Sequence, residues 1–239
     1  GMTDLPIYEK YEKYPPMVFS PDSGYPVTNL EKGKFGVSFS CGWVESKTLP
    51  RILSVKGGTV SNIVPREAVA VIEGLDLSAA EKVCGDISGK FSANITCRAL
   101  EDGSIEITAH GEAAHASAPF AGLNAHTLLL SVLTELPIAE CDGFYRLRML
   151  SEILPHGDYY GESLGVACED EISGKLTMDF GVFEYSLTGM SGNLDMRTPV
   201  CADDLDLEKT VFSRFGKAGI MCQTHEKMPS HYVPADSPF

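Results

Sequence analysis

The spacing of apolar residues predicts β-strands over residues 51–74 and 94–110. In residues 105–110 apolar and polar residues alternate, a period of two that places neighbouring side chains on opposite faces of a strand. Residues 51–74 predict two short strands around the turn "GG", and residues 94–110 predict a hairpin around the turn "EDG". One face of the second hairpin strand is expected to be buried, and its members are Ile105, Ile107 and Ala109.

A longer apolar period predicts helices after these strands. The run "LDLSAAEKVCGDIS" predicts a helix in which Ser78 and Glu81 have the spacing of a capping box. A connecting helix is expected near residues 142–153. The run "GLNAHTLLLSVLTEL" predicts a helix with one apolar stripe packed on a sheet, formed by Ala125, Leu129, Val132, Leu133 and Leu136.

Strand and helix patterns return in the last third of the chain. The strands "KLTMDFGVFEYSLTG" and "SGNLDMRTP" precede the helix "DDLDLEKTVFSRFGKAG" and the strand "IMCQTHEKM". Each half also places a motif containing Pro ahead of a Leu-Asp-Leu helix start, although the intervening spacing differs. These blocks predict an α+β fold, with antiparallel sheets and helices on one face, arranged as two ferredoxin-like repeats.

The pattern divides the chain into four segments. Residues 1–50, rich in Pro, Tyr and Gly, predict an extended lead-in segment that wraps a surface, because this composition disfavours a long helix. Residues 51–137 predict the first α+β repeat of one domain, residues 138–174 a connecting helix and loop, and residues 175–239 the second repeat. A glycine before the first methionine and the abrupt stop at "DSPF" are what we expect of a fragment excised from a longer protein.

Composition and charge narrow the classes of function. The 239 residues carry a formal net charge of -14 with a pI near 4.8, so we expect no nucleic-acid or anionic-membrane partner, because phosphates would be repelled. Seven cysteines without a Cys-x-x-Cys pair argue against a disulfide framework and for a reducing, cytoplasmic location. No run approaches the roughly 20 apolar residues of a membrane helix.

The clearest candidate for chemistry is His115, which lies in "HGEAAHASAPFAGLNAH" between a predicted strand and a predicted helix. Three roles fit an imidazole there: a catalytic group, a metal ligand or a hydrogen-bonded loop residue. Metal-dependent hydrolysis needs converging His, Asp and Glu ligands, whereas "HGD" at 156–158 and "CEDEISG" at 168–174 indicate a polar loop and a solvated turn. A cysteine nucleophile beside His115 is a further alternative, but buried, inert thiols are the common case.

Four motifs resemble one family. The stretches "GGTVSNIVPREAVAVIEG", "GEAAHASAPFAGLNAH", "GNLDMRTP" and "MPSHYVPADSPF" are similar to the non-catalytic domain of bacterial Xaa-His dipeptidases of the PepV type, within the aminoacylase and carboxypeptidase group of zinc hydrolases. The resemblance covers nearly the whole chain and is most specific in His-Ala-Ser-Ala-Pro with Gly-Leu-Asn-Ala after it. It implies a lid domain that closes over substrate bound to a separate catalytic domain with two zinc ions.

The resemblance also implies roles for individual residues. His115 matches the lid histidine that donates a hydrogen bond to the oxyanion formed when water attacks the peptide carbonyl. Asn62 matches an amide that contacts the substrate, and Arg197 matches a guanidinium that grips the substrate carboxylate. The residues expected to shape the turn before the helix are Pro119, Gly122 and Asn124.

Each of these residues has a structural alternative. His115 fits a loop residue that is hydrogen-bonded to the backbone, and Asn62 fits a turn residue that makes an Asx bond. Arg197 fits an ion pair with Asp195. His126, on the helix after the turn, is expected at the surface or in packing.

The hypothesis that follows is a lid that contributes oxyanion and carboxylate contacts, but no metal ligands, to a zinc-dependent metallodipeptidase. Zinc belongs to the full-length parent, so none is expected to bind here, and this chain alone is expected to be inactive. The expected partners are a short peptide substrate and the missing catalytic domain of the same chain, and two repeats within one lid favour a monomer. The alternatives are an inactive module of the same fold that binds peptides or proteins, and a hydrolase that is active by itself.

Overall fold

The structure, a computed structural model, describes residues 7–15 and 28–237. The long elements in chain order are β2 (Gly33–Gly42), β3 (Arg51–Gly57), β4 (Glu67–Glu73), α2 (Leu77–Phe91), β5 (Asn94–Ala99), β6 (Ile105–His110), α3 (Ala125–Leu133), α4 (Asp142–Ile153), β9 (Thr177–Ser186), β10 (Gly189–Thr198), α5 (Leu207–Lys217) and β11 (Met221–Met228). The short ones are β1 (Leu30–Glu31), η1 (Pro119–Ala121), β7 (Glu169–Asp170), β8 (Gly174–Lys175), η2 (Val200–Asp204) and β12 (His231–Tyr232).

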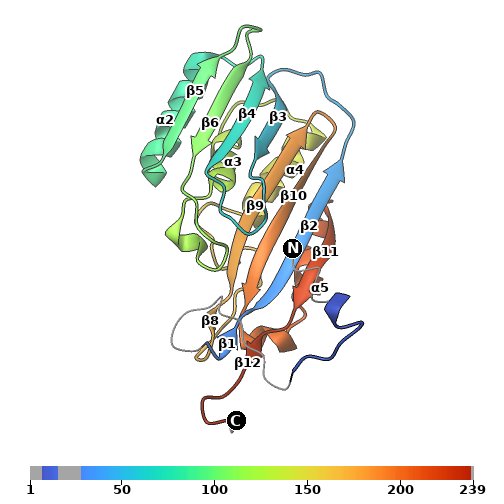
Figure 1. The fold of residues 1–239 in the computed structure, drawn as a ribbon. Coiled ribbons are helices and arrows are strands. Elements are labelled where there is room, and N and C mark those ends of the chain that lie inside the picture. The colour runs from blue at the N-terminus through green and yellow to red at the C-terminus, as the bar shows by residue number, and fades with distance from the viewer. Residues whose placement is uncertain (1–6, 16–27, 238–239) are drawn as a thin grey trace.

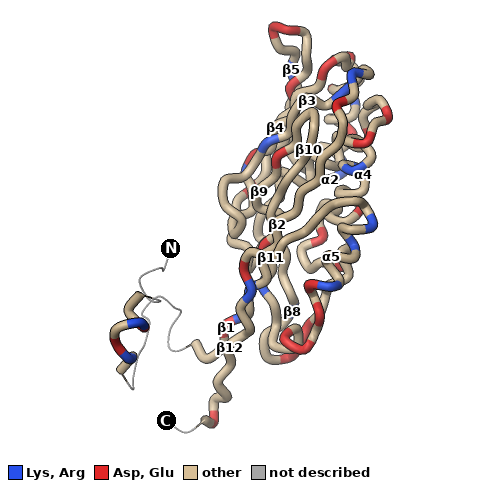
Figure 2. Tube along the Cα trace, turned by 90° about the vertical axis from the view of Figure 1, so that its right-hand side faces the viewer, with Lys and Arg blue, Asp and Glu red and all other residues tan. Residues whose placement is uncertain are grey.

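An antiparallel sheet of eight strands forms the centre of the molecule. Its strand order is β11-β2-β10-β9-β3-β4-β6-β5, and the helices lie behind it in one layer (Figure 1). Figure 2, turned by 90°, shows α2, α4 and α5 together on one side of the strands. The α+β fold with antiparallel strands and helices on one face is therefore confirmed. Within residues 7–15 and 28–237, no helix has the length and apolar character needed to cross a membrane.

The sheet has two halves with the same strand pattern. One half runs β3-β4-β6-β5 and the other runs β9-β10-β2-β11, so that β3 and β9 meet in the middle. In each half, the helix after the second strand, α2 or α5, leads into the edge strand. The seam between β3 and β9 is short, and its pairs are Val55–Tyr185, Lys56–Glu184 and Gly57–Phe183.

Strand β2 corrects one part of our expectation for residues 1–50, of which residues 1–6 and 16–27 lie outside the part of the chain that the structure describes. Residues 33–42 do not wrap a surface but form an interior strand between β10 and β11. Their side chains alternate, and the members that face the core are Phe35, Val37, Phe39 and Cys41. The second half of the sheet therefore depends on a strand that precedes the first half in the sequence.

Helix α3 is buried on all sides rather than along one stripe. Leu128, Leu129 and Leu130 are consecutive and almost fully buried, and the helix contacts β4, β6 and β9 as well as α2 and α4. His126 is 1% exposed and lies against the ring of Phe180. Of the two positions expected for His126, the structure shows packing and not the surface.

Helix α2 begins at a different cap from the one predicted. Its N-cap is Asp76, whose carboxylate accepts the backbone N–H groups of Ser78 and Ala79. The expected capping box at Ser78 and Glu81 is therefore wrong by two residues. The earlier start adds Leu77, which packs against the core, to the apolar stripe of the helix.

Candidate functional site

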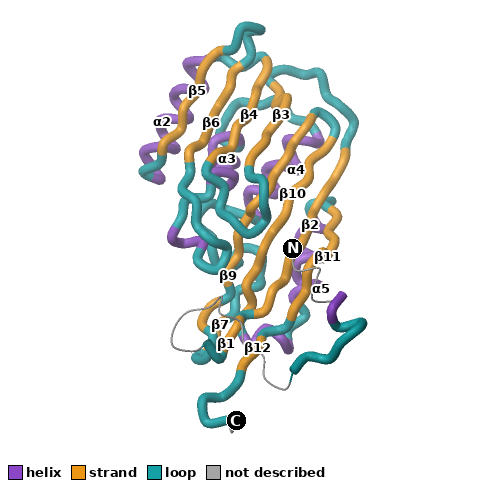
Figure 3. Tube along the Cα trace, viewed as in Figure 1, coloured by secondary structure: helices purple, strands orange, loops and turns teal. Residues whose placement is uncertain are grey.

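Two loops form the candidate site at the point where the halves of the sheet diverge. Pairing between β3 and β9 ends at Gly57, and residues 58–66 and 111–124 then replace β3 as neighbours of β9 (Figure 3). The first loop approaches the strand closely at Gly181, where a Cβ would lie 2.4 Å from the carbonyl oxygen of Ser61. Only glycine permits this approach, so the path of the loop is fixed by the sequence of β9.

A short antiparallel bridge joins the two loops and carries His115. The amide of Ala116 donates to the carbonyl of Asn62 over 3.0 Å, and a second bond of the same kind lies on the other side of the bridge. This pattern makes Ile63 and His115 a directly opposed pair, in which the two side chains lie close together on one face. Ile63 is 43% exposed, so the exposed imidazole has an apolar neighbour.

The imidazole of His115 is held by Ser117. The backbone N–H of Ser117 donates to His115 Nδ1 over 3.2 Å, and Ser117 Oγ lies 2.8 Å from the same nitrogen. A backbone amide only donates, so Nδ1 is an acceptor and the proton of the neutral ring is on Nε2. The exposed ring therefore presents an N–H donor on the side opposite Ser117.

Arg197 lies on β10 in an ion pair with Asp195. Arg197 Nε and Nη2 donate to the two carboxylate oxygens over 2.7 and 3.2 Å, and the two side chains are 12% and 8% exposed. The pair uses one edge of the guanidinium, and Nη1 lies outside it. Arg197 is opposite Thr177, whose hydroxyl donates to Ala116 O over 2.9 Å, so Arg197 and the loop of His115 meet at the same end of β9.

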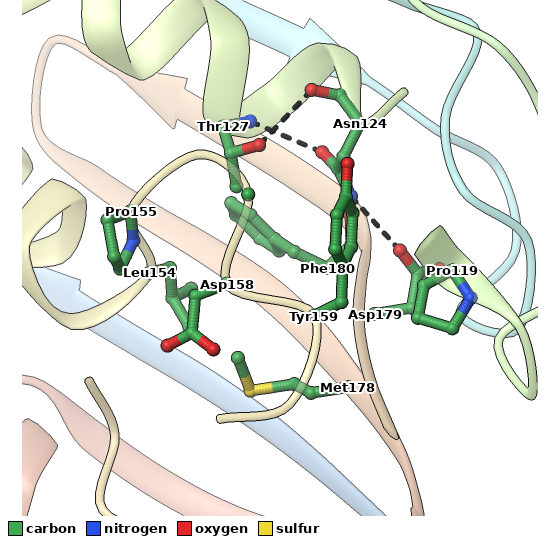
Figure 4. A pocket seen from close by; sticks show the side chains of 11 residues that line it. Pro119, Asn124, Thr127, Leu154, Pro155, Asp158, Tyr159, Met178, Asp179 and Phe180 are labelled. Carbon is green, nitrogen blue, oxygen red and sulfur yellow. Dashed lines mark hydrogen bonds between the residues drawn. The ribbon is translucent and has the colours of Figure 1, made fainter. Parts of the chain in front are cut away.

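Asp179 adds a buried carboxyl beside this pair, opposite Asp195 across β9 and β10. Asn124 Nδ2 donates to Asp179 Oδ1 over 3.0 Å, and Asn124 Oδ1 accepts the N–H group of Thr127 (Figure 4). The same oxygen accepts the N–H group of His126 and so caps α3. Asp179 Oδ2 has no hydrogen-bond partner among the described residues. Burial, aided by the charge of Asp195 and opposed by the bond from Asn124, raises the pKa of Asp179 to about 7.

Sequence reasoning did not identify Asp179 as a site residue, nor the contact of Ser117 with His115. Asp179 could be found from the sequence, because it is an acidic residue inside the apolar run "LTMDFGVF" and a buried strand rarely carries an unpaired carboxylate. Ser117 lies inside the recognised motif, but its contact with His115 depends on the loop conformation, which the residue pattern does not fix.

The backbone brings the three expected site residues into neighbouring segments. Asn62 and His115 lie on the same bridge, and this bridge is anchored beside the strand pair that carries Arg197. Asn62 is half-buried and lies in the turn directly before Ile63, where its carbonyl accepts the amide of Ala116. The substrate contact assigned to Asn62 stays a prediction.

The three expected turn residues each have a local structural explanation. Pro119 begins the short helix η1, and Asn124 is the N-cap of α3. A Cβ on Gly122 would lie 2.5 Å from the carbonyl oxygen of Glu112, so the paired loop strands need glycine there. Their part in a functional site stays a prediction.

The donor groups of the described residues do not form a zinc site. Among the residues that the structure describes, no group of three or more His, Cys, Asp and Glu side chains is placed to hold a metal ion. Asp158 in the "HGD" stretch instead accepts backbone N–H groups of residues 160–163. All seven cysteines are free, and burial raises the pKa of Cys84 to about 12, which disfavours the nucleophilic thiolate there.

Comparison with known proteins finds dipeptidases. No family model matches the chain. It is 34% identical over 242 residues to the Beta-Ala-Xaa dipeptidase of Lactobacillus delbrueckii subsp. lactis, covering 98% of this chain and 49% of that protein. It is 31% identical over 241 residues to YtjP of Bacillus subtilis (strain 168), provisionally named a dipeptidase, covering 97% and 49%. The chain thus spans about half the length of the curated relatives it matches.

Among solved structures, the aminoacylhistidine dipeptidase of Vibrio alginolyticus matches over 87% of this chain and 47% of that one. Its identity is 13% and its TM-score is 0.35.

Proposed function

We propose that this chain is the substrate-binding lid of a zinc-dependent dipeptidase whose metal ligands lie in polypeptide outside these 239 residues. The observation that carries the proposal is the coverage: nearly all of the chain aligns with only half of a dipeptidase. When bound to the other half, zinc would supply an activated water and polarise the peptide carbonyl.

In this proposal the residues of the chain bind and orient the peptide. His115 points Nε2–H at the place where negative charge develops on the carbonyl oxygen, which stabilises the transition state more than the bound substrate. Arg197 receives the terminal carboxylate of the peptide at the Nη atoms, while Asp195 holds its other edge. Ile63, exposed beside His115, gives the substrate an apolar contact.

The proposal includes a reducing, cytoplasmic location, which the seven free cysteines support. It also includes a monomer, because the sheet already joins two halves of the same pattern within one chain. Sedimentation of the chain at increasing concentration tests the second point, and a concentration-dependent dimer would contradict it.

The test compares this chain alone with the same chain in its longer native polypeptide. Dipeptide hydrolysis is measured for both with added zinc, and the flanking gene sequence is searched for His-x-Asp and Glu-Glu motifs. We expect the motifs on the flanks and turnover only by the longer protein. Turnover by this chain alone would identify a self-sufficient hydrolase, and a longer protein that binds peptides without turnover would identify an inactive binding module. Either result overturns the proposal.

A further inference from the structure

The turn at residues 115–117 fixes the ring of His115 from within. Ser117 contacts Nδ1 through both its hydroxyl and its backbone amide. The turn is closed by a bond of 2.8 Å from the amide of Ala118 to the carbonyl of His115, and Pro119 begins η1 directly afterwards. The ring is therefore held by its own loop rather than by a distant side chain.

Hydrogen-bond polarity assigns the tautomer of His115. The amide of Ser117 has a proton and no lone pair to offer, so a proton on Nδ1 would face another proton. With Nδ1 unprotonated, the Ser117 hydroxyl also donates to it, since the nitrogen then offers only a lone pair. Both contacts thus favour the same neutral form, with the proton on Nε2.

His126 shows the opposite arrangement in the same molecule. Its Nδ1 lies 3.0 Å from the backbone carbonyl oxygen of Phe180, and a carbonyl oxygen only accepts. The proton of His126 is therefore on Nδ1. One chain thus holds two histidines in opposite tautomers, each set by a backbone group.

We propose that Ser117 is a positioning residue for His115: its amide selects the tautomer that carries a proton on Nε2, and its hydroxyl fixes the orientation of the ring. The consequence for catalysis rests on the proposed function. The tautomer and the ring contact are properties of this chain by itself, so they can be measured without the rest of the enzyme.

The test of the tautomer is a long-range ¹H–¹⁵N correlation spectrum of the chain with ¹⁵N-labelled histidine, at a pH where the imidazoles are neutral. The variants His115→Gln and His126→Gln assign the signals. We expect a protonated Nε2 in His115 and a protonated Nδ1 in His126, which serves as the internal reference. A protonated Nδ1 in His115 would overturn the inference.

The test of the hydroxyl is Ser117→Ala, in which Nδ1 keeps only the longer amide bond. We expect the Nδ1 resonance of His115 to move toward that of an imidazole nitrogen without a hydrogen bond, and Ser117→Thr to restore it. The matched control is Ser38→Ala, because Ser38 Oγ lies 3.0 Å from His225 Nδ1; it should change His225 and leave His115 unchanged.

An unchanged Nδ1 resonance in Ser117→Ala removes the hydroxyl from the proposal. Ser117 is exposed, so the variant is expected to fold, and circular dichroism confirms this for each sample. The proposed function is tested separately, by the turnover of the longer protein. A failure of either test is therefore distinguishable from a failure of the other.

Discussion

The Nε2–H of His115 is the group on which the proposed transition-state contact depends. We expect His115→Ala in the longer protein to lower kcat for dipeptide hydrolysis by about 10²-fold or more, the effect of losing one donor to an oxyanion. His225→Ala is the control, because this exposed histidine is also bonded to a serine but lies on β11, away from the loop bridge. Steady-state kinetics give the answer, and an unchanged kcat would remove His115 from the mechanism.

The guanidinium of Arg197 should affect both binding and turnover. We expect Arg197→Ala to raise KM and lower kcat for dipeptides with a free carboxylate, because this contact is made in the ground state and in the transition state. Arg197→Lys keeps a positive charge beside Asp195 but loses the bidentate N–H donors of the guanidinium. It therefore separates the loss of carboxylate recognition from the cost of leaving the buried Asp195 carboxylate unpaired. Wild-type kinetics that are equal for free and amidated dipeptides would contradict the role.

Asp179 and His126 should give opposite dependences of stability on pH. Burial raises the pKa of Asp179 from 3.8 to about 7, so the unfolded state releases this proton first and the free energy of unfolding falls as pH rises between these values. Burial lowers the pKa of His126 from 6.5 to about 4, so the unfolded state takes up a proton first and stability is lost as pH falls through this window. The two effects oppose each other between about pH 4 and 6.5.

The variant Asp179→Asn separates these two effects. The variant removes the loss of stability that Asp179 causes as pH rises, and it keeps the gain of stability that His126 causes. Relative to wild type, its free energy of unfolding should therefore rise with pH, most of all between pH 4 and 7. Urea unfolding across this range measures the difference. Parallel profiles for the variant and the wild type would show that Asp179 is not protonated in the folded chain.

At the scale of elements, periodicity predicted most of the strands and helices, and failed where two signals competed. Residues 1–50 contain many prolines, and this composition obscured the alternation in "KFGVSFSC" that builds β2. Helix α3 has the expected apolar stripe, but its other faces are apolar as well, because a sheet covers one side of the helix and other helices cover the rest. Which strands become neighbours depends on long-range pairing, which no local period encodes.

The candidate site was predictable to the level of its motifs and no further. His115, Asn62 and Arg197 were identified from short runs of sequence, but the runs do not state that Asn62 and His115 share a bridge or that Arg197 is paired. The sequence allows Arg197 either an ion pair with Asp195 or a contact with substrate. The structure shows the ion pair, formed by Nε and Nη2, and Nη1 lies outside it. Residue patterns miss Asp179 and Ser117, because their contacts with Asn124 and His115 form only in the fold.

The cap of α2 provides a test at the scale of one element. Asp76 accepts the backbone N–H groups of Ser78 and Ala79 at the start of the helix. We expect Asp76→Ala to lower the free energy of unfolding by about 1 kcal/mol, the usual effect of losing an N-cap. Ser78→Ala keeps both backbone bonds and should have a smaller effect. Urea unfolding measures both, and a larger loss in Ser78→Ala would restore the cap that the sequence predicted.

At the scale of the whole molecule, helices join the two halves of the sheet in addition to the strand seam. The seam between β3 and β9 has only three residue pairs. Helix α3 spans it, because it contacts β4 and β6 in one half and β9 in the other, and α4 contacts both α3 and α5. Since these helices are buried in one continuous core, neither half can unfold without exposing apolar surface of the other.

The whole chain should therefore unfold as one unit, and β2 is the place to test this. Val37 is fully buried in β2, and Val37→Ala should lower the free energy of unfolding by about 2 kcal/mol through lost burial and a small cavity. We expect the slowest-exchanging amides of β6, in the other half, to lose the same free energy of protection as those of β10. Ser40→Ala, on the exposed side of β2, is the control. If protection fell in β10 and not in β6, the two halves would be independent units, and the expectation of a single cooperative unit would be wrong.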